Sequence, residues 1–194
     1  MNFSGYQYVQ ETCQCLKLAE QSMAQNFSIS PLMFELARIR AAQLNNCFVC
    51  AQARITVALE KGEKMDRILA IPVWKEAGDV FTPQERAALL WSETLTNTNI
   101  NGIPDDVVKK VKVFLSPKEL SELTTCITTM NMWNRQSVAL EQLESYMSGG
   151  KAPAEDHHHH EEADHHHADE EEHSHHHEEA PAAAAAAVDD DDEL

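Results

Sequence analysis

Three Ser-Pro or Thr-Pro pairs mark the points where helices begin in the first 150 residues. Each pair joins an N-cap residue to a proline at the first helical position: Ser30-Pro31, Thr82-Pro83 and Ser116-Pro117. At the second and third pairs a glutamate, Glu85 or Glu119, follows three residues after the cap and completes a capping box. No run of residues alternates between apolar and polar as a half-buried strand does. The sequence therefore predicts an all-α fold.

Apolar spacing and helix-ending signals extend these starts into about six to seven helices. They are expected at about 6–25, from 31 to 44, from Asn46-Cys47 to Gly62, at 64–71, from Thr82 through Leu95, at 104–114 and at 117–146.

Charge divides the chain into two parts. The 194 residues carry a formal charge of −17, but the 16 acidic residues of 151–194 stand against Lys151 alone. That segment therefore carries −15, which leaves −2 for residues 1–150. The same segment holds all 11 histidines and almost no large apolar side chain to offset the entropy of ordering. We expect one helical domain at 1–150 and a disordered, His- and acid-rich low-complexity tail at 151–194.

Composition excludes several classes of protein. No stretch of 18 apolar residues is present, so we expect no membrane span. Lys and Arg are not clustered into a basic stripe, which disfavours nucleic-acid binding. The first residues lack a secretory signal, and five cysteines are too few for a disulfide scaffold of this length. These features favour a cytoplasmic protein.

The sequence Cys47-Phe48-Val49-Cys50 is the chemically distinctive feature of the helical part. A CxxC at a helix start brings two sulfurs within bonding range, and the free N–H groups there favour a thiolate. Three interpretations stay open on spacing alone: a redox pair, two packed apolar cysteines, or a metal site. The metal site is the least supported, because zinc needs four ligands and residues 1–150 contain no histidine.

Longer stretches carry a family resemblance. Glu35 precedes Cys47 with eleven residues between them, and the flanking segments read ELARIRAAQLNNCFVCAQAR, IPVWKEAGDVFTPQERAALLWSETLTN, IPDDVV and ELSELTTCITTMNMWNRQSVAL. Over about residues 30–140 the chain resembles the carboxymuconolactone decarboxylase-like superfamily, and in particular its alkylhydroperoxidase AhpD-like branch. The resemblance implies a compact helical bundle that forms homo-oligomers, often trimers or hexamers, with a thiol-dependent peroxidase or antioxidant role.

The resemblance also implies roles for particular residues. Cys50 would be the attacking thiolate, Cys47 the resolving partner, and Glu35 the proton acceptor through a water. The partners would be a peroxide substrate and an external dithiol reductant, with no cofactor required. Glu35 has an alternative interpretation as a salt-bridged glutamate with Arg38 or Arg40.

One position departs from the family pattern. The family has a histidine four residues after the second cysteine, and this chain has Arg54 there. A guanidinium stays charged and cannot accept the proton, although it can favour a nearby thiolate. Two alternatives follow: a non-enzymatic oligomeric thiol or metal-handling protein whose relay has decayed, and lactone decarboxylation, which the CxxC and the histidine-free core disfavour.

The remaining candidate residues are interpreted as structural. This set comprises Trp133, Asn134 and Arg135, which would brace the core, and Cys126 in the long helix; Cys13 and Cys15 point to different helix faces and receive no joint function.

The histidines of the tail are candidate metal ligands. Neutral imidazole with carboxylates nearby suits Ni, Zn and Cu(II), at low specificity because the signal is only compositional. The residues are His157, His158, His159, His160, His165, His166, His167, His173, His175, His176 and His177.

Overall fold

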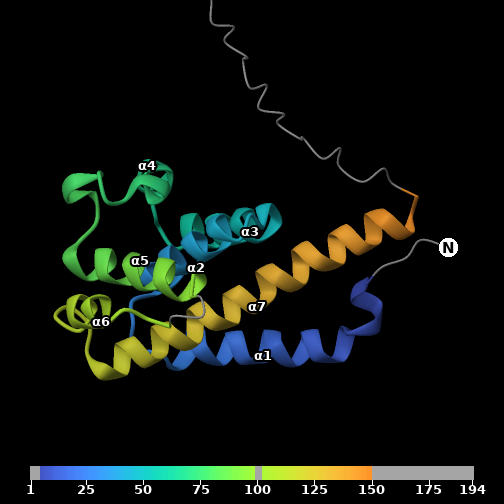
Figure 1. Ribbon diagram of the computed structural model, residues 1–194, viewed down its shortest axis with the longest axis horizontal. Coiled ribbons are helices and arrows are strands. Elements are labelled where there is room, and N and C mark those ends of the chain that lie inside the picture. The colour runs from blue at the N-terminus through green and yellow to red at the C-terminus, as the bar shows by residue number, and fades with distance from the viewer. Residues whose placement is uncertain (1–4, 99–101, 150–194) are drawn as a thin grey trace, which may run out of the picture. The chain divides into compact units, whose positions relative to one another are not determined.

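The computed structural model describes residues 5–98 and 102–149, and the expected tail at 151–194 lies outside this range. The described residues form seven α-helices and three short 3-10 helices, with no strand among them (Figure 1). The α-helices are α1 Gln10–Asn26, α2 Pro31–Leu44, α3 Phe48–Glu60, α4 Met65–Ala70, α5 Pro83–Thr96, α6 Asp105–Val111 and α7 Pro117–Met147; the 3-10 helices are η1 Gly5–Tyr8, η2 Ile71–Val73 and η3 Gly78–Val80. The all-α prediction is confirmed.

The three predicted helix starts are confirmed in their hydrogen bonds. The Ser30 hydroxyl accepts from the backbone N–H of Met33 at 3.0 Å. Thr82 and Ser116 each form a complete capping box with the glutamate three residues on. Because each cap satisfies N–H groups that a helix cannot bond internally, these positions fix where α2, α5 and α7 begin.

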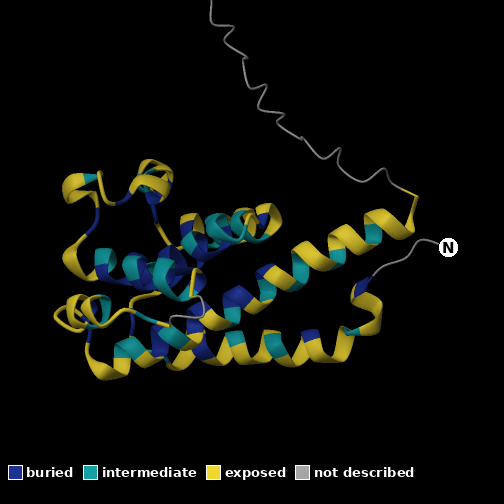
Figure 2. Ribbon diagram, viewed as in Figure 1, coloured by how far each residue is buried: buried dark blue, intermediate teal, exposed yellow. Residues whose placement is uncertain are grey.

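Helix α2 is the centre of the domain. It contacts α3, α5 and α7, and much of its ribbon is dark blue, the colour of buried residues, in Figure 2. Leu36, Ala37 and Ile39 are fully buried. One apolar cluster joins α2 to α1, α5, α6 and α7, and a second joins it to α3, α4, η2 and α5. A residue on α2 is therefore held from several sides.

The first expected helix, at about 6–25, is divided in the structure. Val9 leaves the helical region at ψ 21°, so η1 ends at Tyr8 and α1 begins at Gln10. The split lets η1 contact the second half of α7, where Gly5 approaches Leu140 so closely that a Cβ at Gly5 would lie 2.6 Å from that side chain. A sequence pattern does not encode such a tertiary contact.

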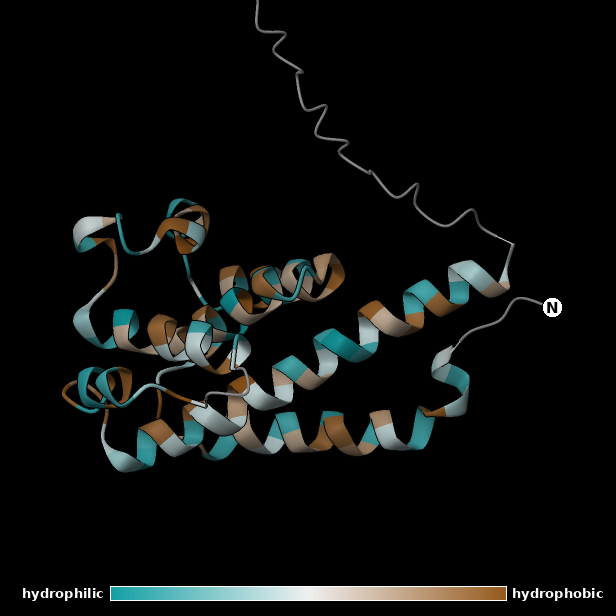
Figure 3. Ribbon diagram, viewed as in Figure 1, coloured by the Kyte–Doolittle hydropathy of each residue, from teal (hydrophilic) through white to brown (hydrophobic). Residues whose placement is uncertain are grey.

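The two halves of α7 have different environments. Its buried residues lie between Glu122 and Asn134, whereas the turns after Asn134 carry exposed apolar residues, as Figures 2 and 3 together show. No helix within residues 5–98 and 102–149 is long and apolar enough to cross a membrane.

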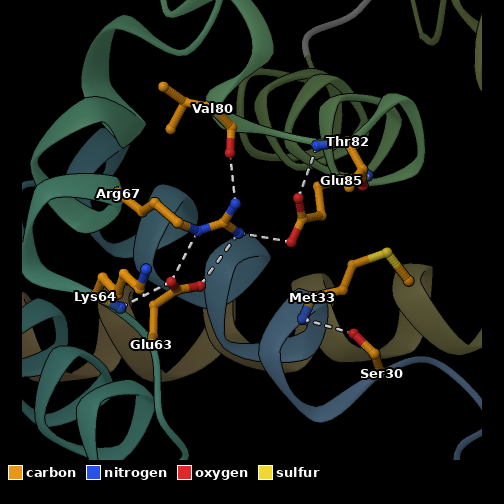
Figure 4. A network of polar contacts seen from close by, with 8 residues as sticks. All are labelled: Ser30, Met33, Glu63, Lys64, Arg67, Val80, Thr82 and Glu85. Atoms are coloured by element: carbon orange, nitrogen blue, oxygen red, sulfur yellow. Dashed lines mark hydrogen bonds and ion pairs between the residues drawn. The ribbon is translucent and has the colours of Figure 1, made fainter.

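A polar network anchors α4 to the start of α5 (Figure 4). The Arg67 guanidinium donates to Glu63 at 2.8 Å, to Glu85 at 2.7 Å and to the carbonyl of Val80. Because Glu85 also closes the capping box of α5, the same carboxylate fixes both the helix start and its contact with α4.

Candidate active site

A left-handed residue turns the chain from α2 into the CxxC. Asn46 has φ 53°, a conformation that asparagine tolerates better than most residues, and the N–H of Cys47 then donates to the carbonyl of Ala42 at 3.0 Å. Cys47 becomes the N-cap of α3, and Cys50 lies in its first turn. The free N–H groups of that turn favour negative charge on sulfur.

The two cysteines form a disulfide but differ in exposure. Cys47 and Cys50 are bonded, with 5.3 Å between their Cα atoms. Cys47 is only 2% exposed, whereas Cys50 is half-buried and packs against a small cluster of Ala41, Ala42 and Met130. Cys50 is therefore the sulfur with access to its surroundings.

Cys50 lines a cavity of about 240 Å³ between α1, α2, α3 and α7. Val49 and Ala53 of α3 and Met130 and Trp133 of α7 contribute apolar surface. The charged lining residues are Lys17, Glu20, Arg38 and Arg54. The cavity thus combines a sulfur, an apolar wall and an excess of positive charge.

Glu35 lies behind this wall on α2, buried and surrounded by cations. Its Oε1 accepts from the Lys61 Nζ at 2.6 Å, and its Oε2 lies 3.7 Å from Arg38 Nη1 and 4.0 Å from Arg54 Nη1. Among the described residues Oε2 has no hydrogen-bond donor. The predicted ion pair with Arg38 is present, while Arg40 pairs instead with Glu93.

Arg54 lies between Glu35 and the cavity. Its side chain is 23% exposed and lines the cavity, one turn after Cys50. Burial lowers the pKa of Arg54, and the nearby Arg38 charge lowers it further, against the opposing effect of Glu35. The guanidinium remains charged near neutral pH, so it supplies fixed positive charge and cannot act as a base.

Helix α7 braces the turn before the CxxC. The Asn45 side-chain amide donates to Asn131 Oδ1 at 2.6 Å and to Asn134 Oδ1 at 3.1 Å. Arg135 reaches the carbonyl of Thr96 at 3.4 Å. Asn134 and Arg135 therefore make structural contacts, as the sequence indicated, whereas Trp133 lines the cavity beside Cys50.

Comparison with known proteins assigns the family. The family model described as the carboxymuconolactone decarboxylase family matches residues 14–94. An uncharacterized Bacillus subtilis protein, YdfG, is 33% identical over 113 residues, which cover 58% of this chain and 76% of that protein. The chain belongs to the carboxymuconolactone decarboxylase family. The chain is also similar to a solved structure from Agrobacterium tumefaciens, a protein of unknown function described as a candidate antioxidant defence protein AhpD. The match has a TM-score of 0.67 and 25% sequence identity, and it covers 72% of this chain and 94% of the Agrobacterium chain.

Within this member of the carboxymuconolactone decarboxylase family, the structure brings together all four residues predicted for the helical part. Cys47, Cys50, Glu35 and Arg54 lie on the facing helices α2 and α3 or at their junction. Two further residues were missed by sequence reasoning, Lys61 on Glu35 and Glu20 on Arg38, and neither lies in a local motif. Trp133 was singled out by the sequence as a structural residue, and in the structure it lines the cavity.

The other cysteines do not take part in the Cys47–Cys50 disulfide, and all three are free. Burial raises the pKa of the Cys126 thiol to about 12, which keeps it protonated and inert. Cys13 is buried and Cys15 exposed, consistent with different helix faces. The described part of the chain contains no group of three His, Cys, Asp or Glu side chains that could hold a metal ion. The histidines from His157 to His177 lie outside the described residues.

Proposed function

We propose that this chain is a thiol-dependent peroxidase that reduces alkyl hydroperoxides through a Cys47–Cys50 dithiol/disulfide cycle. The observation that carries the proposal is the position of Cys50: it is disulfide-bonded to a buried partner while lining a cavity of about 240 Å³. A redox pair needs one accessible sulfur and one protected sulfur within bonding range, and this pair provides both.

The Cys50 thiolate attacks the terminal peroxide oxygen, the O–O bond breaks, and the leaving alkoxide takes a proton to become an alcohol. Cys50 is then a sulfenic acid, and the Cys47 sulfur displaces its hydroxyl group as water to form the disulfide. An external dithiol is oxidised as it restores both thiols by exchange.

The surroundings favour Cys50 as the attacking sulfur. It lies in the first turn of α3, with Arg54 one turn later, and Arg38 of α2 lines the same cavity. These fixed charges and the helix N-terminus stabilise a thiolate. Cys47 is buried at the N-cap and would act after the sulfenic acid forms.

Glu35 is proposed to accept the proton through a water. Its Oε1 is already bonded to Lys61, which leaves Oε2 as the oxygen with a free lone pair among the described residues. Two cations that line the cavity lie near Oε2: Arg38 Nη1 at 3.7 Å and Arg54 Nη1 at 4.0 Å. Arg54 would supply a fixed positive charge beside Glu35, at the position where the family resemblance implies a histidine.

Partners and location are proposed on the same basis. Exposed Phe48 and Val49, at 76% and 48%, give the CxxC helix an apolar surface that suits a homo-oligomer, a trimer or hexamer by family likeness. The dithiol cycle requires a reducing compartment, which favours the cytoplasm. The cycle needs no cofactor, and Ni, Zn or Cu binding is proposed only for the tail.

A non-enzymatic thiol or metal-handling protein is the second candidate, because Arg54 replaces the family's proton carrier. Lactone decarboxylation is the minor alternative, since such chemistry makes no use of a dithiol. Turnover of a carboxylated muconolactone by the double Cys→Ser variant would favour the latter.

Peroxide consumption by the purified chain tests the proposal. With tert-butyl hydroperoxide and dithiothreitol, we expect turnover in the wild type and none in Cys50→Ser. Cys15→Ser is the matched control, because Cys15 is an exposed cysteine remote from the CxxC in sequence and should retain the full rate. Equal rates in wild type and Cys50→Ser would refute the peroxidase proposal.

A further inference from the structure

The cavity beside Cys50 is surrounded by more positive than negative charge. Lys17, Arg38 and Arg54 line it with Glu20 as the single acid, and Lys61 and Glu35 form an ion pair behind it. These six groups sum to +2 in a domain that carries −2 over residues 1–150. The local charge is therefore opposite in sign to that of the domain.

Arg54 is the half-buried cation of this group that has no hydrogen-bond acceptor among the described residues, whereas Lys17 is exposed. Arg38 is bound by Glu20, and Lys61 by Glu35. No described residue accepts a hydrogen bond from the Arg54 guanidinium, and its nearest carboxylate oxygen is 4.0 Å away. A guanidinium has five N–H donors, so the wall of the cavity presents a planar donor group with no acceptor among the described residues.

Electrostatics point the same way. Burial and the Arg38 charge both lower the pKa of Arg54, and Glu35 opposes them without cancelling them. The positive charge of Arg54 is therefore only partly compensated by the Glu35 carboxylate. A second anion at the guanidinium would restore the balance. A carboxylate fits, because its two oxygens match the guanidinium fork in a bidentate pair.

Apart from Ser137, the uncharged lining around Cys50 is apolar, and the cavity is small. Val49, Ala53, Met130 and Trp133 form the wall around Cys50, and the volume of about 240 Å³ is below the range of about 300–1,000 Å³ typical for drug-sized ligands. Cys50 and Arg54 are four residues apart on one face of α3. A short aliphatic chain could therefore contact both.

We propose that the cavity selects organic hydroperoxides that also bear a carboxylate, with Arg54 binding the carboxylate, the aliphatic chain on Met130 and Trp133, and the peroxide at Cys50. This inference rests on the proposed peroxidase function for the chemical step, but the anion site itself does not. At the position where the family resemblance implies a proton-carrying histidine, Arg54 would bind the carboxylate of the substrate instead.

Binding is tested without catalysis in the full chain carrying Cys47→Ser and Cys50→Ser. By calorimetry, hexanoate should bind about 10- to 100-fold more tightly than methyl hexanoate, because charge-assisted hydrogen bonds carry that difference. Adding Arg54→Gln should remove the preference for hexanoate over its ester, and Arg54→Lys should retain part of it. Lys110→Gln is the control, because it makes the same change of charge at an exposed residue of α6, and it should leave the preference unchanged. Equal binding of acid and ester by the chain with native Arg54 would overturn the proposal.

Kinetics supply the second test. For wild type, kcat/KM with 6-hydroperoxyhexanoate should exceed that with its methyl ester by a similar factor, and the ratio should approach one in Arg54→Gln whatever the absolute rates. Peroxide turnover with no preference for the acid would overturn the anion site and leave the peroxidase intact. Selective hexanoate binding without any peroxide turnover would support the anion site and refute the peroxidase.

Discussion

Arg54 occupies the position at which the AhpD-like resemblance implies a proton-relaying histidine. The properties of its guanidinium therefore decide which steps of the proposed reaction the site can support. Its charge lies one turn after Cys50 and 4.0 Å from Glu35. A fixed cation favours the thiolate in the ground state but cannot carry a proton between sulfur, water and carboxylate. Proton transfer should therefore limit turnover of a neutral hydroperoxide.

Substitution Arg54→His tests this limit. General acid–base catalysis contributes about 10²–10⁴-fold, so even partial recovery of a proton carrier should raise turnover of tert-butyl hydroperoxide measurably near neutral pH. Arg54→Gln, which removes the charge without adding a base, is the control and should not gain activity. An unchanged or slower Arg54→His enzyme with native circular dichroism would mean that the site does not use this relay.

Individual residues differ in how far the sequence predicts them. Glu35 was found only because eleven residues separate it from Cys47 in a family pattern, since a lone glutamate beside two arginines favours a surface ion pair. Lys61 was missed, because it lies 26 positions from Glu35 and only the antiparallel packing of α2 and α3 brings the two together. Ion pairs between helices leave no local signal.

Helix starts were predicted well, because capping is a local interaction. Ser30, Thr82 and Ser116 each satisfy N–H groups within three residues, so the short sequence motif contains the whole interaction. The break at Val9 was missed, and it accompanies a close approach of Gly5 to Leu140 that no local pattern encodes. The cavity, formed by four helices, also lay beyond any sequence pattern.

The turn between α2 and α3 should depend on the backbone of Asn46. Its φ of 53° is strained for β-branched residues, while the side chain is exposed. Asn46→Val should lower the free energy of unfolding by about 1–2 kcal/mol, whereas Asn46→Gly should be nearly neutral. Urea denaturation at one fixed protein concentration measures both; equal stability of the two variants would mean that the turn relaxes without the left-handed residue.

At the scale of the whole chain, the proposed catalytic residues and the histidines lie in different segments. The predicted site residues of the helical part lie between Glu35 and Arg54, and every histidine lies between His157 and His177. Metal binding and peroxide reduction should therefore be separable.

Truncation tests this separation. Full-length chain should bind Ni²⁺ or Zn²⁺, and binding should weaken as pH falls through about 6.5, because protons compete for imidazole nitrogen. A chain ending at residue 150 should lose this binding while keeping its helical content, oligomeric state and peroxidase rate, as calorimetry and parallel assays would measure. If the truncated chain lost its activity too, the tail would be supplying a base or metal to the Cys47–Cys50 site.

Mass spectrometry of the fully reduced protein after one equivalent of alkyl hydroperoxide tests the central claim most directly. The account predicts a loss of two hydrogens from the protein, with a Cys47–Cys50 disulfide in the peptide map and with Cys13, Cys15 and Cys126 still reduced. In Cys47→Ser the oxidised product should instead stop at a sulfenic acid on Cys50, which dimedone, a reagent that reacts with sulfenic acids and not with thiols, would trap. Reduced Cys47 and Cys50 beside unconsumed peroxide, or oxidation confined to exposed Cys15, would contradict it.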